Sequence, residues 1–343
     1  MSGLHVGLVY GGQSPEHEVS ILSARNVRTA LEGRHRVTPI YIDRDGQWSV
    51  LEQGADLEGA TGAPARFTSR GIEGVDLDVV FPVLHGPNGE DGTVQGFLQT
   101  LGLPFVGPDV LGSSVCMDKA TAKRLLRDAG LPGVPFAVVR THDRDAFSFD
   151  RLSEKLGSPL FVKPANAGSS VGVSRVQDAA GLEDALTLAF QYDRTALVEQ
   201  FVDGREIEVA VLGNENPQAS IPGEIVSTAE FYTYDAKYQD PEASRMEVPA
   251  DLEDGMASRL HELAVRAYAA LGCEGMARVD FFVTADGDAF VNEINTIPGF
   301  TARSMYPVMW EKTGRSQEQL MDDLLQLALD RHERDSARRF TRL

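Results

Sequence analysis

A hairpin within residues 278–304 constrains the fold more than any other stretch of this sequence. Two β-type runs, ARVDFFV (277–283) and AFVNEIN (289–295), flank Asp286-Gly287, a dipeptide that favours a two-residue type I′ turn. Such a turn places Asp280 directly opposite Glu293, and Arg278 opposite Asn295. Because side chains alternate along a strand, these four polar residues are expected to share one face of the hairpin.

This polar face predicts a metal site formed by Asp280, Glu293 and Asn295. Two carboxylates opposite each other on adjacent strands lie roughly 5 Å apart and repel each other unless a cation offsets them. Carboxylate and amide oxygens suit Mg²⁺ that bridges to phosphate better than they suit zinc. A solvated face with scattered charges is the competing interpretation, but the opposite face of the hairpin is apolar. Arg278 beside the carboxylates offers a fork for a substrate carboxylate or phosphate.

The charge balance narrows the range of partners. The formal net charge of −19 argues against nucleic acid and anionic membranes, so a phosphate ligand needs a few placed cations and backbone amides. The sequence has no apolar run of about 18 residues and no signal peptide, and we expect a cytoplasmic protein. Cys116 and Cys273 lack the spacing of a disulfide or metal motif and are predicted to be buried apolar residues.

The first hundred residues have the order strand, helix, strand, strand. Apolar strands are predicted at 4–10, 35–43 and 75–85, with a helix between the first two that Ser14 caps and Pro15 begins. This order predicts a parallel sheet with ligands at the carboxyl ends of its strands. The dinucleotide fingerprint GxGxxG is absent, which argues against a dehydrogenase. His85 ends the third strand before a glycine-rich loop, where a structural role and a ligand-binding role are about equally supported.

Two lysines in the middle of the chain are candidates for phosphate binding. Lys163 ends an apolar strand and precedes a Gly/Ser loop whose backbone amides can cradle an anion, and Lys119 begins a helix that Asp118 caps. No Walker A motif is present. Further along, Glu199 and Glu206 can bond an adenine amino group or a ribose, and the rings of Phe201 and Phe282 can wall an adenine.

Residues 168–172 also match GxSxG, the nucleophile elbow of esterases. That motif needs a helix after the serine, whereas the run VGVSRV predicts a strand, so we reject an esterase. The chain becomes strand-rich after Gly204, and a polar, aromatic segment at 228–247 is a candidate lid. Helices are predicted at 252–271 and 317–333, and the first domain boundary within 102–113.

Taken together, these segments resemble the D-alanine–D-alanine ligases of the ATP-grasp superfamily over essentially the whole chain. The motifs follow in order as GGQSPEHEVS (11–20), LHGPNGEDGTVQG (84–96), CMDK (116–119), FVKPANAGSSVGV (161–173), VEQFVDGREIEV (198–209), YDAKY (234–238), RVDFFV (278–283) and NEINTIPGFTARS (292–304). Ala165-Asn166 is a mild departure in a tolerant part of its motif.

The resemblance implies an α/β fold, α+β in its C-terminal part, with three domains. These would be a Rossmann-like pre-ATP-grasp domain at 1–107, a central ATP-grasp subdomain at 108–198 and a C-terminal subdomain at 199–343. It also implies a cytoplasmic carboxylate–amine ligase, expected to be a homodimer, that acts in peptidoglycan synthesis. Its small-molecule substrates would be ATP and D-alanine, and its cofactors two Mg²⁺ or Mn²⁺ ions.

The resemblance also implies a role for each matching residue. Asp280, Glu293 and Asn295 would hold the metals. The nucleotide would contact Lys119, Lys163, Ser169, Glu199, Phe201, Val202, Glu206, Phe231, Lys237 and Phe282. The first D-alanine would bind Glu16 and His85, with Ser169 linking Glu16 to Tyr238. The second D-alanine and the tetrahedral intermediate would bind Arg278, Gly299, Ser304 and Met305.

The implied reaction runs through an acylphosphate. The carboxylate of the first D-alanine attacks the γ-phosphate of ATP, and the amine of the second attacks the acyl carbon while Arg278 and the Gly299 amide stabilise the oxyanion. Lactate-using relatives typically carry Phe at the position of Tyr238, so the sequence predicts the dipeptide-forming type. Two alternatives stay open at this point: an ATP-grasp enzyme with another acid or amine, and a non-catalytic nucleotide-binding module.

Overall fold

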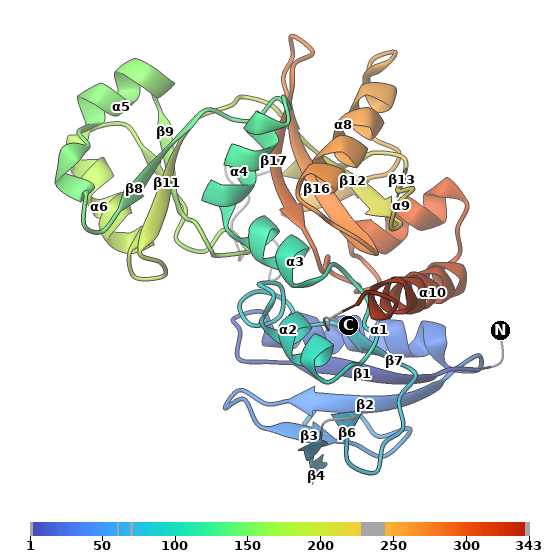
Figure 1. Cartoon of the computed structure of the whole chain (residues 1–343). Helices are drawn as coiled ribbons and strands as arrows, with labels where there is room; N and C mark the ends of the chain where they lie inside the picture. The colour runs from blue at the N-terminus through green and yellow to red at the C-terminus, as the bar shows by residue number, and fades with distance from the viewer. Residues whose placement is uncertain (1–2, 60–61, 69–70, 228–243, 340–343) are drawn as a thin grey trace.

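Three β-sheets, formed by successive parts of the sequence, organise the computed structural model, which describes residues 3–59, 62–68, 71–227 and 244–339. Figure 1 shows the first sheet at the bottom, the second as a lobe on the left and the third at the upper right. The mixed α/β class predicted from the sequence is therefore confirmed. None of the described helices is long and apolar enough to cross a membrane.

The first sheet has the strand order β4-β3-β2-β1-β7. Its strands are β1 (His5–Gly11), β2 (Arg36–Ile42), β3 (Trp48–Val50), β4 (Ala63–Pro64) and β7 (Val79–Pro82), and β5 (Phe67–Thr68) pairs with β6 (Gly71–Ile72) nearby. Parallel pairing of β1 with β2 and β7 confirms the predicted sheet. The helices α1 (His17–Leu31) and α2 (Thr93–Thr100) pack on its two faces.

The predicted start of the first helix is wrong. We expected Ser14 to cap it and Pro15 to begin it, but α1 starts at His17 with Glu16 at its N-cap position. The Ser14 hydroxyl accepts a hydrogen bond from the Glu16 amide at 3.1 Å, which folds this segment into a turn before the helix. The turn places the Glu16 side chain at the carboxyl end of β1.

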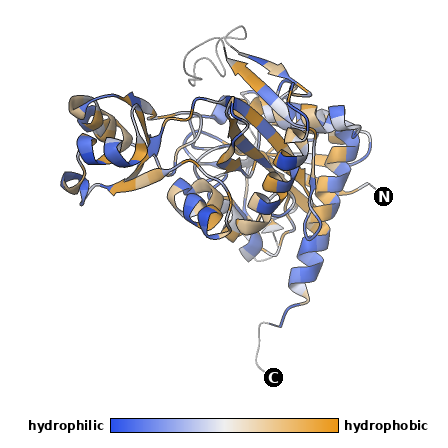
Figure 2. Ribbon diagram, turned by 90° about the horizontal axis from the view of Figure 1, so that it is seen from above, coloured by the Kyte–Doolittle hydropathy of each residue, from blue (hydrophilic) through white to orange (hydrophobic). Residues whose placement is uncertain are grey.

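The second sheet is antiparallel, with the order β10-β9-β11-β8. Its elements are β8 (Phe136–Arg140), η1 (Arg144–Ala146), α5 (Phe149–Leu156), β9 (Leu160–Pro164), β10 (Ser174–Val176), α6 (Ala179–Ala189) and β11 (Thr195–Gln200). One face packs under α5 and α6 through Leu160, Val162 and Val198. The alternation of the strands puts Lys163 and Glu199 on the other face. Figure 2 shows this sheet as a lobe set apart from the rest of the chain.

The third sheet runs β15-β14-β12-β16-β17, with β13 beside β12. Its elements are β12 (Arg205–Leu212), β13 (Gln218–Ala219), β14 (Gly223–Ser227), β15 (Ser244–Glu247), α8 (Met256–Ala270), β16 (Met276–Val283) and β17 (Ala289–Asn295). Helices α3 (Val110–Met117) and α4 (Lys119–Asp128) precede the second sheet, and α4 stands between that sheet and β17 (Figure 1). The predicted burial of both cysteines is confirmed, and Cys116 Sγ lies 3.4 Å from Cys273 Sγ.

The hairpin of β16 and β17 has the predicted pairs but a different turn. Arg278 faces Asn295 and Asp280 faces Glu293. Thr284, however, bonds to Asp288 across a three-residue loop, not a two-residue one. A bulge next to Asp280 leaves Asn292 without a paired residue and shifts the register by one position. The extra loop residue and the bulge cancel, so the polar face forms as predicted.

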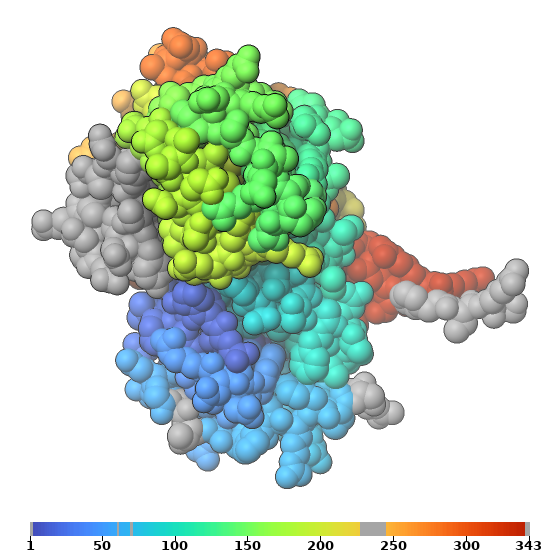
Figure 3. Space-filling model, turned by 90° about the vertical axis from the view of Figure 1, so that its left-hand side faces the viewer, coloured from blue at the N-terminus to red at the C-terminus, as the bar shows by residue number. Residues whose placement is uncertain are grey.

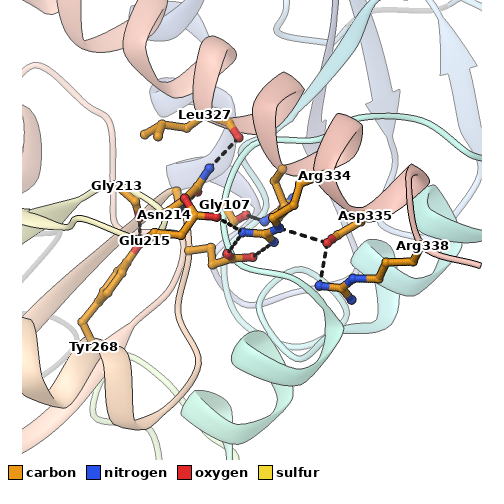
Figure 4. Close-up of polar contacts among 12 residues, drawn as sticks. Gly107, Gly213, Asn214, Glu215, Tyr268, Leu327, Arg334, Asp335 and Arg338 are labelled. Atoms are coloured by element: carbon orange, nitrogen blue, oxygen red, sulfur yellow. Dashed lines mark hydrogen bonds and ion pairs between the residues drawn. The ribbon is translucent and has the colours of Figure 1, made fainter.

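The C-terminal helices return to the first sheet. Side chains of α9 (Met305–Thr313) and α10 (Gln317–Ser336) share one hydrophobic core with α1 and β1. Arg331 of α10 donates to the carbonyls of Phe105, at 2.7 Å, and Gly107. Arg334 donates to Glu215 and Glu274, each at 2.6 Å, beside Asn214 (Figure 4). The C-terminal helix thus joins the first and third sheets. The division at 107 and 198 stays a prediction.

Candidate active site

The polar faces of the second and third sheets meet across α4. Lys163 Nζ, on β9, lies 3.4 Å from Asn292 Oδ1 at the bulge of β17. Lys119 Nζ, at the first turn of α4, lies 3.3 Å from Glu293 Oε2 and donates to the Ala167 carbonyl at 2.8 Å. The two predicted phosphate-binding lysines are therefore brought next to the predicted metal-binding hairpin.

Arg278 is held by two carboxylates on the polar face of the third sheet. Its Nε and Nη2 donate to the two oxygens of Asp280, each at 2.7 Å, and Nε also lies 3.0 Å from Glu208 Oε2. Burial by itself lowers the pKa of Arg278, but Asp280 and Glu208 outweigh it and raise this pKa well above its ordinary value. Glu208 was missed in the sequence, although it alternates with Glu206 in REIEV and therefore lies on the same face of β12.

The predicted metal-binding set consists of hard oxygen donors. Asp280 Oδ2 accepts a hydrogen bond from Asn295 Nδ2 at 2.8 Å, and Glu293 faces Asp280 across the strands. Among the described residues, no group of three His, Cys, Asp or Glu side chains is arranged to hold a metal. Two carboxylates and an amide fit Mg²⁺, which takes one or two carboxylates and fills its other positions with water and phosphate oxygens.

Glu199 is clamped between two lysines. Its Oε1 lies 2.9 Å from Lys123 Nζ and its Oε2 lies 2.8 Å from Lys163 Nζ, and the three side chains are largely buried. Burial alone raises the pKa of Glu199, but the two ammonium groups outweigh it and hold the pKa below its usual value. Lys123 was also missed in the sequence, although it lies one helical turn after Lys119 and therefore on the same side of α4.

The two rings predicted to wall an adenine, Phe201 and Phe282, come from different parts of the chain, and their role stays a prediction. Phe201 stacks on Phe161, with ring centroids 5.7 Å apart, and remains 38% exposed. The guanidinium of Arg175 lies over the Phe201 ring, 5.8 Å from its centre. Phe282 lies on the third sheet, directly opposite Glu206 of β12. Val202 is half-buried in the connection between the second and third sheets. Phe161 was not selected from the sequence.

A loop of the second sheet reaches Glu16 of the first. Ser169 Oγ donates a hydrogen bond to Glu16 Oε1 at 2.5 Å. Ser169 and Ser170 have left-handed backbones, with φ of 51° and 58°, a conformation that costs non-glycine residues about 1–3 kcal/mol each. A Cβ at Gly86 or Gly168 would lie 3.0 Å or 3.3 Å from Glu16 Oε2, so these two glycines leave room for the carboxylate.

Glu90, in the glycine loop after β7, is a further acidic residue near Glu16. Its carboxylate accepts a hydrogen bond from the Gly86 amide at 2.8 Å. Burial, with a smaller contribution from the Glu16 charge, raises the pKa of Glu90 to about 8. The raised pKa favours the protonated form of the Glu90 carboxyl beside Glu16. Glu90 was not selected from the sequence.

His85 lies in a buried network beneath the segment that follows β17. Its Nε2 is 3.1 Å from Ser23 Oγ and its Nδ1 is 3.1 Å from the Ile297 carbonyl. The Ser23 hydroxyl in turn accepts from the Phe300 amide at 3.2 Å. His85 is therefore placed to hold the 296–300 segment. Its predicted contact with D-alanine stays a prediction.

Gly299, in the segment after the hairpin, closely approaches Ser304. A Cβ there would lie 2.8 Å from Ser304 Oγ, which accepts from the Thr301 amide at 3.0 Å. Met305 is buried in the hydrophobic core, and its predicted contact with the second D-alanine stays a prediction, as do those of Gly299 and Ser304. Phe231, Lys237, Tyr238 and most of the candidate lid lie outside the described residues.

Comparisons with known proteins identify the family. Residues 5–108 match the family model "D-ala D-ala ligase N-terminus", and residues 125–326 match "D-ala D-ala ligase C-terminus". A D-alanine–D-alanine ligase A from Salmonella typhimurium is 47% identical and covers 99% of this chain and 100% of its own. One from Oceanobacillus iheyensis is 45% identical, over 96% of each chain.

Solved structures agree with the sequence relatives. The D-alanine–D-alanine ligase from Coxiella burnetii has a TM-score of 0.89 at 37% identity and covers 98% of this chain and 97% of its own. The VanG D-Ala:D-Ser ligase from Enterococcus faecalis has a TM-score of 0.87 at 35% identity, over 95% and 99%. The fold and these side chains together define an ATP-grasp ligase. More particularly, the chain belongs to the D-alanine–D-alanine ligase family.

Proposed function

We propose that this protein joins two D-alanine molecules into D-alanyl-D-alanine, with ATP converted to ADP and phosphate, as a step of peptidoglycan precursor synthesis. Membership of the ligase family supports the choice of substrates. One observation supports the chemistry: Lys119 Nζ lies 3.3 Å from Glu293 Oε2 and Lys163 Nζ lies 3.4 Å from Asn292 Oδ1. Two cations and the acidic hairpin thus converge where a triphosphate would need both.

ATP would lie between the second and third sheets. Glu199 would accept the adenine amino group, Glu206 a ribose hydroxyl, and the rings of Phe201 and Phe282 would cover the base with Val202 and Phe231. Lys119, Lys163 and Lys237 would bind the phosphates, assisted by the amides of the loop that contains Ser169. Their positive charges act locally at the phosphates, although the net molecular charge of −19 repels the nucleotide.

Asp280, Glu293 and Asn295 would hold Mg²⁺ or Mn²⁺ between the hairpin and the phosphates. The bound cations supply charge neutralisation at the phosphoryl oxygens during transfer. Asn295 donates to Asp280 and Lys119 pairs with Glu293, so each of the two carboxylates also has a protein partner.

The first D-alanine would bind through its ammonium group to Glu16, which Ser169 orients with its 2.5 Å hydrogen bond. This places the substrate carboxylate toward the γ-phosphate for attack, and D-alanyl phosphate forms. The second D-alanine would bind through its carboxylate near Arg278 and Ser304, and its amine would attack the acyl carbon. Arg278 and the Gly299 amide would stabilise the oxyanion, after which phosphate leaves. The 228–247 segment with Tyr238 would cover the site and exclude water.

Phosphate release tests this proposal. The purified protein is incubated with Mg²⁺-ATP and D-alanine, L-alanine, D-serine or D-lactate, and the masses of the products are recorded. D-alanine alone should release phosphate and give D-alanyl-D-alanine. Product that contains D-serine would move the assignment toward the D-Ala:D-Ser relatives, and ATP binding without turnover would leave only a nucleotide-binding module. The Tyr238→Phe variant should raise the D-lactate to D-alanine product ratio, and an unchanged ratio would exclude that role for Tyr238.

A homodimer, a divalent-metal requirement and a cytoplasmic location complete the proposal. Light scattering of the purified chain gives the oligomeric state, and activity after removal of metal with a chelator gives the metal requirement.

A further inference from the structure

Lys123 lies in the nucleotide region, although the proposed function gives it no task. It is on α4, its side chain is 3% exposed, and its Nζ lies 2.9 Å from Glu199 Oε1. Lys163 Nζ lies 2.8 Å from the other oxygen, Oε2. The carboxylate predicted to recognise adenine is thus bound by one ammonium group on each oxygen.

The two lysines differ in their surroundings. Lys163 has a second partner on the opposite sheet, Asn292 Oδ1 at 3.4 Å, and precedes the loop that would bind phosphate. Lys123 is more deeply buried, with its Nζ 5.9 Å from the centre of the Phe136 ring. Lys163 can therefore exchange Glu199 for another anion, while Lys123 is confined beside Glu199.

We propose that Lys123 is a positioning residue that fixes Glu199 for recognition of the adenine amino group and releases Lys163 to the phosphates. This inference rests on the proposed function, because it assumes that ATP occupies the site. When Lys163 turns to a phosphate, Glu199 would lose one of its two cations in a buried place. An unpaired buried carboxylate is strongly unfavourable, and Lys123 prevents that state.

The electrostatics agree with this division of roles. Burial lowers the pKa of Lys123, and Glu199 counteracts this effect. The pKa of Lys163 is raised, since Glu199 and Glu293 together outweigh its burial. Glu199 and Glu293 thus favour the charged form of both lysines, but burial prevails only at Lys123.

The role has a consequence for base selectivity. A carboxylate held in one orientation accepts a hydrogen bond from the amino group of adenine and repels the carbonyl oxygen that hypoxanthine carries at the same ring position. Looser positioning of Glu199 weakens this discrimination. Lys123 should therefore control the preference for ATP over ITP without contact to either base.

The experiment compares four variants with the unmodified protein: Lys123→Met, Glu199→Gln, the double variant of both, and Arg124→Met as a control. Arg124 is the exposed neighbour of Lys123 on the same helix, so its variant removes an equal charge. In Lys123→Met we expect kcat/KM for ATP to fall about 10- to 100-fold, because a charged contact with Glu199 is lost. The ATP to ITP selectivity of Lys123→Met should fall as well, while its KM for D-alanine stays unchanged. The Arg124→Met control should have the kinetics of the unmodified protein.

The double variant separates positioning from a structural role. The amide introduced by Glu199→Gln has no charge to neutralise, so the Lys123→Met change should have little further effect in that background. The double variant should therefore exceed Lys123→Met in kcat/KM for ATP. Independent, multiplicative losses would overturn the proposal, as would unchanged ATP to ITP selectivity in Lys123→Met. If Lys123→Met fails to fold, kcat/KM for ATP of the double variant is compared with that of Glu199→Gln. Similar values support the proposal, and a further large loss in the double variant overturns it. An unmodified protein that binds ATP but makes no dipeptide would refute the proposed function, while calorimetry of ATP and ITP binding would still test Lys123.

Discussion

Ser169 donates a 2.5 Å hydrogen bond to Glu16 although 153 residues separate the two in the chain. The bond connects the loop of the second sheet to the carboxyl end of β1. In the space-filling view of Figure 3, the atoms of the second sheet lie directly above those of the first. The contact therefore links the regions proposed to hold the nucleotide and the first D-alanine.

Ser169→Ala should impair use of D-alanine more than it impairs folding. Loss of one hydrogen bond to a carboxylate is worth about 1.5–3 kcal/mol, which predicts a fall of kcat/KM for D-alanine of about 10-fold or more. The same bond is present in the folded chain, so some stability should be lost too, but the variant should remain folded, as its melting temperature would show. Steady-state kinetics with D-alanine varied checks the prediction, and a loss confined to KM for ATP would contradict it.

The metal-binding prediction can be tested through magnesium itself. In Glu293→Gln, one of the two hairpin carboxylates is gone, and we expect the Mg²⁺ concentration for half-maximal activity to rise about 10- to 100-fold. Metal titration at saturating ATP measures this shift. Asp288→Asn at the hairpin loop is the control for a general loss of negative charge. An equal shift in both variants would argue against Glu293 as a direct ligand of Mg²⁺.

The hairpin of β16 and β17 shows which structural features can be predicted from the sequence and which cannot. The alternation of polar and apolar residues correctly gave the face that carries Asp280 and Glu293. The loop length and the bulge at Asn292 could not be predicted, because the Asp-Gly signal fits both loop lengths and Asn292 contacts Lys163 of another sheet only in the folded chain. The register shift from the longer loop and the shift from the bulge cancel, so the predicted pairs are still found.

Two of the charged residues that were missed in the sequence, Lys123 and Glu208, share a physical cause. Lys123 and Glu208 act on Glu199 and Arg278, which come from distant strands, and a single charged residue on a helix or strand looks like a solvated surface group. Only the fold shows that each is buried against a charge of opposite sign. Motif matching selects groups that touch ligands and overlooks those that hold them.

Glu208→Gln should disturb Arg278 without removing it. Arg278 would keep Asp280 but lose the charged partner 3.0 Å from its Nε. We therefore expect kcat/KM for the second D-alanine to fall about 10-fold. Glu224→Gln is a matched control, because Glu224 lies on the opposite face of the same sheet and pairs with Arg205 at 2.8 Å. Equal losses of activity in the two variants would mean that only the stability of the sheet matters.

Glu90 should make the stability fall as pH rises. Its pKa is raised to about 8 in the folded protein, so the folded state binds a proton that the unfolded state releases near pH 4.5. The stabilisation is complete below the unfolded pKa, declines above it and is lost as pH passes the folded value, at about 1.4 kcal/mol per pKa unit. Urea unfolding of Glu90→Gln across this interval should show a weaker pH dependence than the unmodified protein. The exposed Glu52→Gln is the control, and identical slopes in all three proteins would contradict the prediction.

Arg331→Met tests whether α10 fastens the first sheet to the third. Arg331 is 5% exposed and donates to the carbonyls of Phe105 and Gly107, and its guanidinium lies 4.5 Å from the centre of the Phe105 ring. Methionine fills similar volume but leaves two buried carbonyls without these donors, which predicts a loss of about 2–4 kcal/mol in the free energy of unfolding. Arg338 is exposed and pairs with Asp335 at 2.8 Å. The control variant Arg338→Met should therefore change the free energy of unfolding by less than about 0.5 kcal/mol. Denaturant unfolding measures both values, and comparable stabilities of the two variants would show that the hydrophobic core, not Arg331, joins the two sheets.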